Sequence, residues 1–291
     1  MSCLVKFMEN FDTYAQNTWC PGCGNFNILQ AFKNAVNDLI AKGVPKENIV
    51  FTTGIGCHAK IFDYLNLNSF YSLHGRAVAT AEGIKLGNPA LKVITFSGDG
   101  DSYDEGLDHL IHAAKRNIDI TVLIHDNRVF ALTTGQFTAT SPKGFKGKST
   151  PEGSIEEPFN PLELMLASGA TFIARAYSPK IEHLKELIIK GVEHKGFSFI
   201  EVLQPCISLF NTYQFYQEKV YELEEENLTS KERALKKIQE WDYKNGENAK
   251  IPIGIFYKVQ KPTYEEELLK ELNSSKRNGG VNIKKILEEH L

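Results

Sequence analysis

The chain has 291 residues, which suits one large α/β domain or one domain with an appended tail. Its 33 Lys and Arg residues nearly balance 36 Asp and Glu residues, so no excess of positive charge supports nucleic-acid binding. No apolar run reaches the length that spans a bilayer, and charged residues interrupt the N-terminus, so we expect no membrane contact, no signal peptide and a cytoplasmic location.

Helix-like and strand-like segments alternate through the first two-thirds of the sequence. The expected elements are a helix after Gly24, a strand at 49–53, a helix at 77–86, a strand at 93–96, a helix at 103–116, a strand at 120–124, a helix from Leu162, a strand at 171–174, a helix at 181–193 and a strand at 198–203. This alternation predicts an α/β fold with a doubly wound, mostly parallel sheet.

Two stretches depart from the alternation. Residues 133–158 are polar with little periodicity, and the segment 138–157 fits either a lid or a docking loop. Beyond Gln217 the composition shifts to a charged run at 222–240, one short candidate strand at 251–257 and a polar tail. We therefore divide the chain into an α/β domain at 1–217 and a charged helical C-terminal extension at 218–291, which packs on the domain or on a partner subunit.

The most informative motif lies at the ends of two neighbouring predicted strands. Ser97-Gly98-Asp99-Gly100-Asp101 follows one strand, and Asn127 follows the next, 28 residues after Asp99. In a doubly wound sheet both ends open on the same crevice, where a carboxylate, an amide oxygen and a backbone carbonyl suit Mg²⁺ that carries a diphosphate. The glycines allow close approach, and the helix start after them favours phosphate. An ordinary strand-to-helix turn is the alternative, but the paired Asn favours a thiamine diphosphate site.

Four of the five cysteines lie at turns next to predicted strand or helix ends: Cys20, Cys23, Cys57 and Cys206. In a reducing compartment such cysteines are ligands or redox groups more often than disulfides. Spacing alone fits a zinc site and a [4Fe–4S] cluster equally, with uncoordinated thiols as a third possibility. A cluster has a redox use beside thiamine diphosphate and zinc has none, which favours the cluster. Cys3 has no partner motif.

Seven strings, in order along about residues 19–213, are similar to those of one enzyme family. They are Trp19-Cys20-Pro21-Gly22-Cys23-Gly24, Gly54-Ile55-Gly56-Cys57, His74-Gly75-Arg76, Gly98-Asp99-Gly100-Asp101, Leu132-Thr133-Thr134-Gly135-Gln136, the run from Lys148 to Ile155, and Pro205-Cys206. The chain resembles the β subunit of 2-oxoacid:ferredoxin oxidoreductases, in particular the 2-oxoglutarate or broad 2-oxoacid enzymes, which implies the thiamine-diphosphate-binding fold.

The resemblance implies a role for each matching residue. Cys20, Cys23, Cys57 and Cys206 would ligate one [4Fe–4S] cluster, and Asp99, Asn127 and the carbonyl of Val129 would hold Mg²⁺. Lys60 would contact the substrate carboxylate, and His74 would serve catalysis and cofactor binding. The residues expected to line the cofactor are Ile55, Gly56, Cys57, His58, His74, Gly98, Gly100, Asp101, Ala131 and Leu132. His58, Phe130 and Ala131 depart from the usual family residues, which bears on substrate preference.

The implied reaction is the coenzyme A-dependent oxidative decarboxylation of a 2-oxoacid, 2-oxoglutarate or pyruvate, to acyl-CoA and CO₂, with electrons passing through the cluster to ferredoxin. No glutamate has a convincing context for the aminopyrimidine of the cofactor, so we expect a separate α subunit, or a fused γα subunit, to supply it. Two other functions fit part of the pattern: a non-oxidative thiamine-dependent decarboxylase and a zinc-stapled scaffold subunit. The colour and metal content of an anaerobic preparation would separate them.

Overall fold

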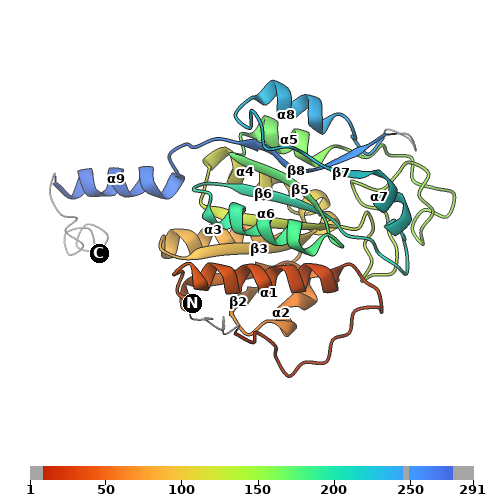
Figure 1. Cartoon of the computed structure of the whole chain (residues 1–291), viewed down its shortest axis with the longest axis horizontal. Coiled ribbons are helices and arrows are strands. Elements are labelled where there is room, and N and C mark those ends of the chain that lie inside the picture. The colour runs from red at the N-terminus through yellow and green to blue at the C-terminus, as the bar shows by residue number, and fades with distance from the viewer. Residues whose placement is uncertain (1–8, 245–248, 278–291) are drawn as a thin grey trace, which may run out of the picture.

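The computed structural model describes residues 9–244 and 249–277, and these form a layered α/β structure around one sheet (Figure 1). The strands are β1 (Ile49–Thr53), β2 (Asn68–Tyr71), β3 (Lys92–Gly98), β4 (Ile120–Asp126), β5 (Phe172–Tyr177), β6 (Ser198–Leu203), β7 (Val220–Glu222) and β8 (Ile251–Lys258). Their order is β2-β1-β3-β4-β6-β5-β8-β7, and every pair is parallel except β5 with β8. The predicted mostly parallel, doubly wound sheet is confirmed.

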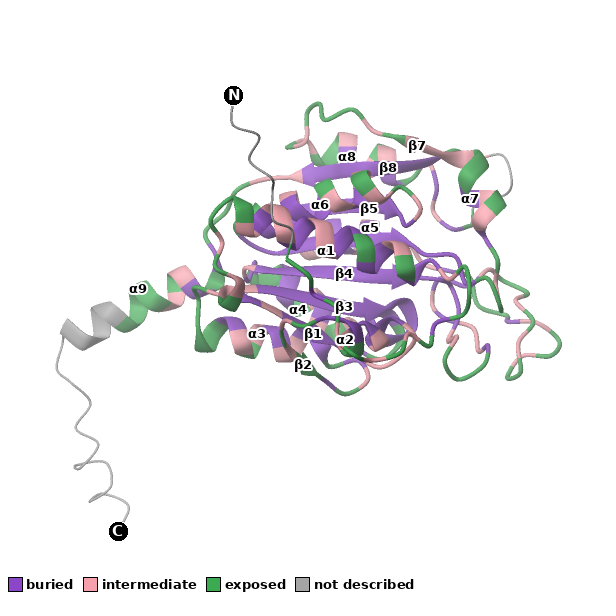
Figure 2. Ribbon diagram, turned by 60° about the horizontal axis from the view of Figure 1, so that its bottom comes forward, coloured by how far each residue is buried: buried purple, intermediate pink, exposed green. Residues whose placement is uncertain are grey.

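Helices cover both faces of this sheet. The helices are α1 (Asn25–Ala41), α2 (Ile61–Tyr64), α3 (Ala77–Gly87), α4 (Leu107–Arg116), α5 (Pro161–Ser168), α6 (Ile181–Glu193), α7 (Tyr213–Lys219), α8 (Lys231–Ile238) and α9 (Tyr264–Arg277), with short turns η1 (Lys46–Asn48), η2 (His58–Lys60) and η3 (Gly100–Asp104). Helices α1 and α6 share one apolar core with the sheet, whereas α3, α4, α5 and α8 share the other. Because both faces are covered, β4, β5 and β6 are buried along their whole length (Figure 2).

The carboxyl ends of β1, β3, β4 and β6 meet at one edge of the sheet, and the longest loops gather there (Figure 2). Parallel sheets bind ligands at this edge. Two strands at the margins, β2 and β7, were not predicted from the sequence. The sequence of β2, Asn-Ser-Phe-Tyr, lacks the alternation of apolar and polar side chains that indicates a strand. Most of its residues are exposed in the structure.

The helix expected over 103–116 is divided in the structure. A π-helical turn, η3, covers Gly100–Asp104, and α4 begins only at Leu107. The break falls at Gly106, where a Cβ atom would lie 2.6 Å from the carbonyl oxygen of Gly75. The backbone of the loop before α3 thus packs against this turn too closely for a side chain. π-Turns of this kind are frequent at functional sites.

The C-terminal part of the described chain contributes to the sheet. The candidate strand at 251–257 is present as β8, and only 231–238 of the charged run at 222–240 is helical. Helix α9 extends away from the rest of the protein in Figures 1 and 2. Cys3 and the tail beyond Arg277 lie outside the described residues. Over residues 9–244 and 249–277, no helix has the length and apolar character needed to cross a bilayer.

Candidate active site

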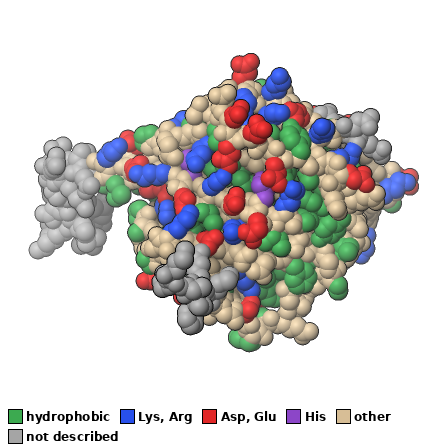
Figure 3. All heavy atoms as spheres, viewed as in Figure 1, with side chains coloured by type: hydrophobic (Ala, Val, Ile, Leu, Met, Phe, Trp, Pro, Cys, Tyr) green, Lys and Arg blue, Asp and Glu red, His purple; other side chains and the backbone are tan. Residues whose placement is uncertain are grey.

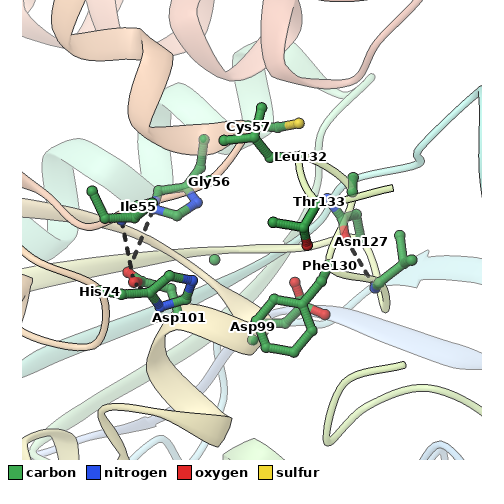
Figure 4. Close-up of a pocket in the computed structure, with 15 residues that line it drawn as sticks. Ile55, Gly56, Cys57, His74, Asp99, Asp101, Asn127, Phe130, Leu132 and Thr133 are labelled. Atoms are coloured by element: carbon green, nitrogen blue, oxygen red, sulfur yellow. Dashed lines mark hydrogen bonds and ion pairs between the residues drawn. The ribbon is translucent and has the colours of Figure 1, made fainter. Parts of the chain in front are cut away.

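A cavity of about 430 Å³, here the Asp99 cavity, opens at the carboxyl ends of β1, β3 and β4 (Figure 4). It is lined by Ile55, Gly56, Cys57, His58, His74, Gly98, Asp99, Gly100, Asp101, Asn127, Val129, Phe130, Ala131, Leu132 and Thr133. The structure therefore brings together all of the residues expected to bind the organic cofactor and its metal. Phe130 and Thr133 line the cavity in addition.

Asp99 is buried at the base of this cavity and is held by two hydroxyl groups. Thr138 Oγ1 donates to Asp99 Oδ2 at 2.7 Å, and Thr140 Oγ1 donates to the same oxygen at 3.4 Å. Burial, together with the nearby carboxyl of Asp126, raises the pKa of Asp99 well above its usual value. A bound divalent cation would favour the ionised form of Asp99, so this carboxyl group fits a metal site.

Asn127 and Val129 are positioned by a turn directly after β4. The backbone N–H of Val129 donates to Asn127 Oδ1 at 3.0 Å, which leaves that oxygen a second lone pair for a metal ion. Asn127 and Asp99 both reach the cavity in Figure 4. Asp99, Asn127 and Val129, the residues named from the sequence as oxygen donors, therefore line the same cavity.

Asp101 joins three segments of the site. Its Oδ1 accepts hydrogen bonds from the backbone N–H of Gly75 at 2.8 Å and of Ile55 at 3.2 Å, and lies 3.0 Å from His74 Nδ1. Burial alone would raise the pKa of Asp101, but hydrogen bonds from His58 and His74 hold it far below its usual range. The same bond raises the pKa of His74. His74 is thus fixed by an ionised carboxylate at the cavity wall.

A second cavity of about 450 Å³, here the thiol cavity, adjoins the first. Its lining includes all four cysteines of the predicted cluster site, Cys20, Cys23, Cys57 and Cys206. Cys57, Asn127 and Ala131 line both cavities, so the two share a wall. Over the described residues, no three or more His, Cys, Asp or Glu side chains converge closely enough to hold a single metal ion. The four sulfurs line a common space and do not meet at one point.

Burial in the thiol cavity disfavours free thiolates, but the cavity also contains a hydrogen-bond donor without a partner among the described residues. Burial raises the pKa of Cys23 and of Cys57 to about 11, although the positive charge of Lys60 opposes this for Cys57. Asn25 lines the cavity, is fully buried, and its Nδ2 has no hydrogen-bond partner among the described residues. Such a donor fits a bound acceptor.

Lys60 lies on the thiol cavity and is not among the residues that line the Asp99 cavity. Its Nζ donates to the carbonyl oxygen of Thr18 at 3.4 Å. A contact with a substrate carboxylate stays a prediction for this residue.

Comparisons with known proteins show what this chain is similar to. Residues 54–202 match the family model "Thiamine pyrophosphate enzyme, C-terminal TPP binding domain", and residues 208–272 match the family model for the C-terminal part of the pyruvate ferredoxin oxidoreductase beta subunit. The chain is 41% identical to 2-oxoacid:ferredoxin oxidoreductase 1, subunit beta, of Aeropyrum pernix, over 90% of this chain and 84% of that protein. The chain belongs to the 2-oxoacid:ferredoxin oxidoreductase β-subunit family.

Further relatives of this family extend the match. The chain is 37% identical to 2-oxoglutarate synthase subunit KorB of Methanothermobacter thermautotrophicus, over 86% of this chain and 85% of that one. A solved structure of 2-oxoglutarate:ferredoxin oxidoreductase from Magnetococcus marinus, with 2-oxoglutarate, coenzyme A and succinyl-CoA bound, superposes with a TM-score of 0.87 at 31% identity, over 96% of this chain and 94% of that chain. The resemblance, the fold class and the assignment as an oxidoreductase subunit are confirmed.

Thr138, Thr140 and Gln204 are among the polar residues of the site that were not predicted from the sequence. Thr138 and Thr140, which hold Asp99, come from the polar segment that was expected to be a lid or a docking loop. Gln204, between β6 and Cys206, lines the thiol cavity and contacts Asn127. Its place two residues before Cys206, a predicted cluster ligand, was the one available signal.

Proposed function

We propose that this chain is the β subunit of an oxidoreductase that converts a 2-oxoacid and coenzyme A to acyl-CoA and CO₂ and delivers the electrons to ferredoxin. The observation that carries the proposal is the wall shared by the Asp99 cavity and the thiol cavity. A group bound in one is next to a group bound in the other. Oxidative chemistry needs this adjacency, whereas simple decarboxylation does not.

Within the proposal, Asp99, Asn127 and the carbonyl of Val129 hold Mg²⁺ on the diphosphate of thiamine diphosphate. When bound, thiamine diphosphate supplies the carbanion chemistry for cleavage of a 2-oxoacid. Phe130 lies against Gly100, where a Cβ atom would be 2.3 Å from the ring, and this packing shapes the floor of the cavity. Asp101 orients His74, whose ring lies 5.9 Å from the ring of Phe130, centroid to centroid.

The four cysteines hold a [4Fe–4S] cluster in the same proposal. A tetrahedral zinc site would bring four sulfurs to about 2.3 Å from one point. The thiols here instead line a cavity of about 450 Å³, and the unpartnered Asn25 amide adds a donor. Both features support a bulky group with anionic sulfur atoms.

The active site is completed by a partner subunit in the proposal. Over the described residues, no glutamate lines the Asp99 cavity, although thiamine enzymes need one against the aminopyrimidine. An apolar rim of Leu73, Leu132, Ile207 and Leu209 is exposed beside the two cavities. Figure 3 shows hydrophobic side chains gathered at the lower right of the face shown, towards the end where the loops of Figure 1 lie. Such a surface fits a permanent contact between subunits.

The test is expression of this chain alone and with its partner subunit under anaerobic conditions. We expect iron, sulfide and thiamine diphosphate in both preparations, and reduction of a viologen dye that depends on a 2-oxoacid and coenzyme A only in the complex. A colourless protein that releases CO₂ without reducing the dye would support the non-oxidative decarboxylase. Stoichiometric zinc without thiamine diphosphate would support the scaffold.

A further inference from the structure

Gln204 lines the thiol cavity, is only 1% exposed and contacts Asn127, which lines both cavities. It follows the last residue of β6, and its backbone N–H donates to the carbonyl oxygen of Asp126, at the end of β4, at 2.9 Å. The neighbouring strand therefore fixes the backbone from which this side chain projects.

Both polar atoms of the Gln204 side chain have partners in the described structure. Its Oε1 accepts from Asn127 Nδ2 at 3.3 Å. Its Nε2 donates to the carbonyl oxygen of Pro205 at 2.7 Å and to Cys23 Sγ at 3.7 Å. The side chain thus connects the residue proposed to bind Mg²⁺ with a residue proposed to bind the cluster.

The neighbours leave this amide one satisfied orientation. Asn127 Oδ1 accepts from the backbone N–H of Val129, so Asn127 presents its N–H groups to Gln204. Pro205 offers only a carbonyl oxygen and therefore requires an N–H group. A flipped Gln204 amide would set N–H against N–H at Asn127 and oxygen against oxygen at Pro205. The N–H group consequently faces the sulfur of Cys23.

We propose that Gln204 is a positioning residue that couples the two cofactor sites: its N–H raises the reduction potential of the cluster through Cys23, and its oxygen orients Asn127 for the metal. The proposal rests on the proposed function. A cluster gains negative charge when it accepts an electron, so a donor to a ligand sulfur stabilises the reduced form more than the oxidised form. Partners that orient metal ligands affect metal affinity about 10- to 100-fold.

The experiment compares the anaerobically purified complex with its Gln204→Met variant, which keeps a side chain of similar length without the amide. We expect the reduced-to-oxidised ratio of the cluster at a fixed applied potential to fall about tenfold, which is about 59 mV for a one-electron couple. Magnesium-dependent binding of thiamine diphosphate should weaken about tenfold in the same variant. Redox titration followed by the electron paramagnetic resonance signal of the reduced cluster measures the first effect, and calorimetry the second.

Tyr213→Phe is the matched control. The hydroxyl of Tyr213 donates to the carbonyl oxygen of Gly22 at 2.8 Å, in the same cysteine turn, and among the described residues it makes no hydrogen bond to a sulfur. Removing it perturbs the turn without removing a donor to the cluster, so the potential should stay at the wild-type value. An equal shift in both variants would assign the effect to loosening of the turn and overturn the proposal.

The contact between Gln204 and Cys23 can also be tested in the wild-type complex, without a substitution. In a complex made with side-chain ¹⁵N-labelled glutamine, the spin echo of the reduced cluster should show weak ¹⁵N modulation from the N–H···S contact. An unchanged potential in Gln204→Met, or an absence of this modulation, contradicts the role of Gln204. A complex without iron and sulfide instead overturns the proposed function, and this inference with it.

Discussion

Two buried carboxyl groups, Asp99 in the Asp99 cavity and Asp126 at the end of β4, lie close enough for Thr140 Oγ1 to contact both. Burial raises the pKa of each, and the Asp126 charge adds to the shift of Asp99. Hydrogen bonds from Tyr243 and Thr140 and the positive charge of Arg128 oppose the rise in the pKa of Asp126. For Asp99 the opposing contributions come from the Thr138 hydroxyl and a backbone N–H, and none comes from a positive charge. Asp99 is thus costly to ionise in the empty protein, and a metal ion would remove that cost.

Asp99→Asn therefore separates stability from binding. Without metal, its free energy of unfolding at pH 7 should equal or exceed that of the wild type, because no buried charge has to be accommodated. Magnesium-dependent affinity for thiamine diphosphate should fall at least about 100-fold, since even outer partners of metal ligands contribute 10- to 100-fold. Urea unfolding and calorimetric titration measure the two effects. Asp108→Asn, at an exposed carboxyl on α4, should change neither, and tight binding by Asp99→Asn would refute the metal role.

Gly54→Ala tests the packing around Asp101. A Cβ atom at Gly54 would lie 1.8 Å from Asp101 Oδ2, so the carboxylate must move and its bonds to Ile55 and Gly75 weaken. We expect a loss of about 1–3 kcal/mol in the free energy of unfolding and weaker cofactor binding. Gly83→Ala, at an exposed position of α3 where no atom outside the helix's own backbone lies within 4 Å of the added Cβ, should gain about 0.5–1 kcal/mol. Equal melting temperatures for the two variants would contradict the close packing at Gly54.

Residues in sequence motifs were predictable because a strand end fixes where they point. The turns after β1, β3 and β4 deliver Gly56, Asp99 and Asn127 to one cavity, as the pattern indicated. Thr138 and Thr140 were not predictable in the same way. They come from a segment without periodicity, and only the folded chain brings their hydroxyls to Asp99.

At the scale of elements, His194 joins the end of α6 to two strands away from the site. Its Nε2 lies 2.9 Å from Thr171 Oγ1, just before β5, and its Nδ1 lies 3.3 Å from Gln260 Nε2, just after β8. Burial, aided by the charge of Lys258 and opposed by Asp119, lowers the pKa of His194 to about 4. The imidazole is therefore neutral in the folded protein at pH 7.

This neutral histidine makes stability depend on pH. The unfolded chain takes up a proton on His194 near pH 6.5, but the folded chain does so only near pH 4. The contribution of His194 to stability is present above pH 6.5 and is lost as the pH falls from 6.5 towards 4, by about 3 kcal/mol. Urea midpoints at pH 7, 5.5 and 4.5 should fall more steeply for the wild type than for His194→Gln. Parallel pH profiles would show that His194 titrates normally.

Some elements could be predicted from the sequence and others could not. Apolar runs and amphipathic periods identified the central strands and α1, α3 and α6, since both faces of the sheet are covered. The break between η3 and α4 could not be predicted from the sequence, because it depends on the close approach of the loop at Gly75 to Gly106. Contacts distant in sequence decide such breaks.

At the scale of the whole molecule, β7 and β8 extend the same sheet beyond residue 217, and the antiparallel β8 pairs with β5. Composition gave little indication of this, since a charged run precedes β8 and only a short apolar segment forms it. The carboxyl edge of the sheet holds both cavities, and the apolar rim adjoins them. Function and contact with the partner are thus expected on one side of the protein.

The apolar rim makes a prediction about assembly. Leu73 is 75% exposed beside the cavity residue His74, and Leu209 is 42% exposed on the thiol cavity. Leu73→Asp and Leu209→Asp should each weaken association with the partner subunit at least about tenfold, because a charge would be buried at an apolar contact. Their melting temperatures as isolated chains should match the wild type, since neither side chain is in the core.

Leu86→Asp provides the comparison for both variants. Leu86 is 39% exposed near the end of α3, which leads into the amino end of β3 and therefore lies away from the rim. Co-purification and light scattering should show full association for this variant and partial association for the rim variants. If all three variants assemble equally well, the partner does not cover the rim and the missing glutamate must reach the Asp99 cavity from another direction.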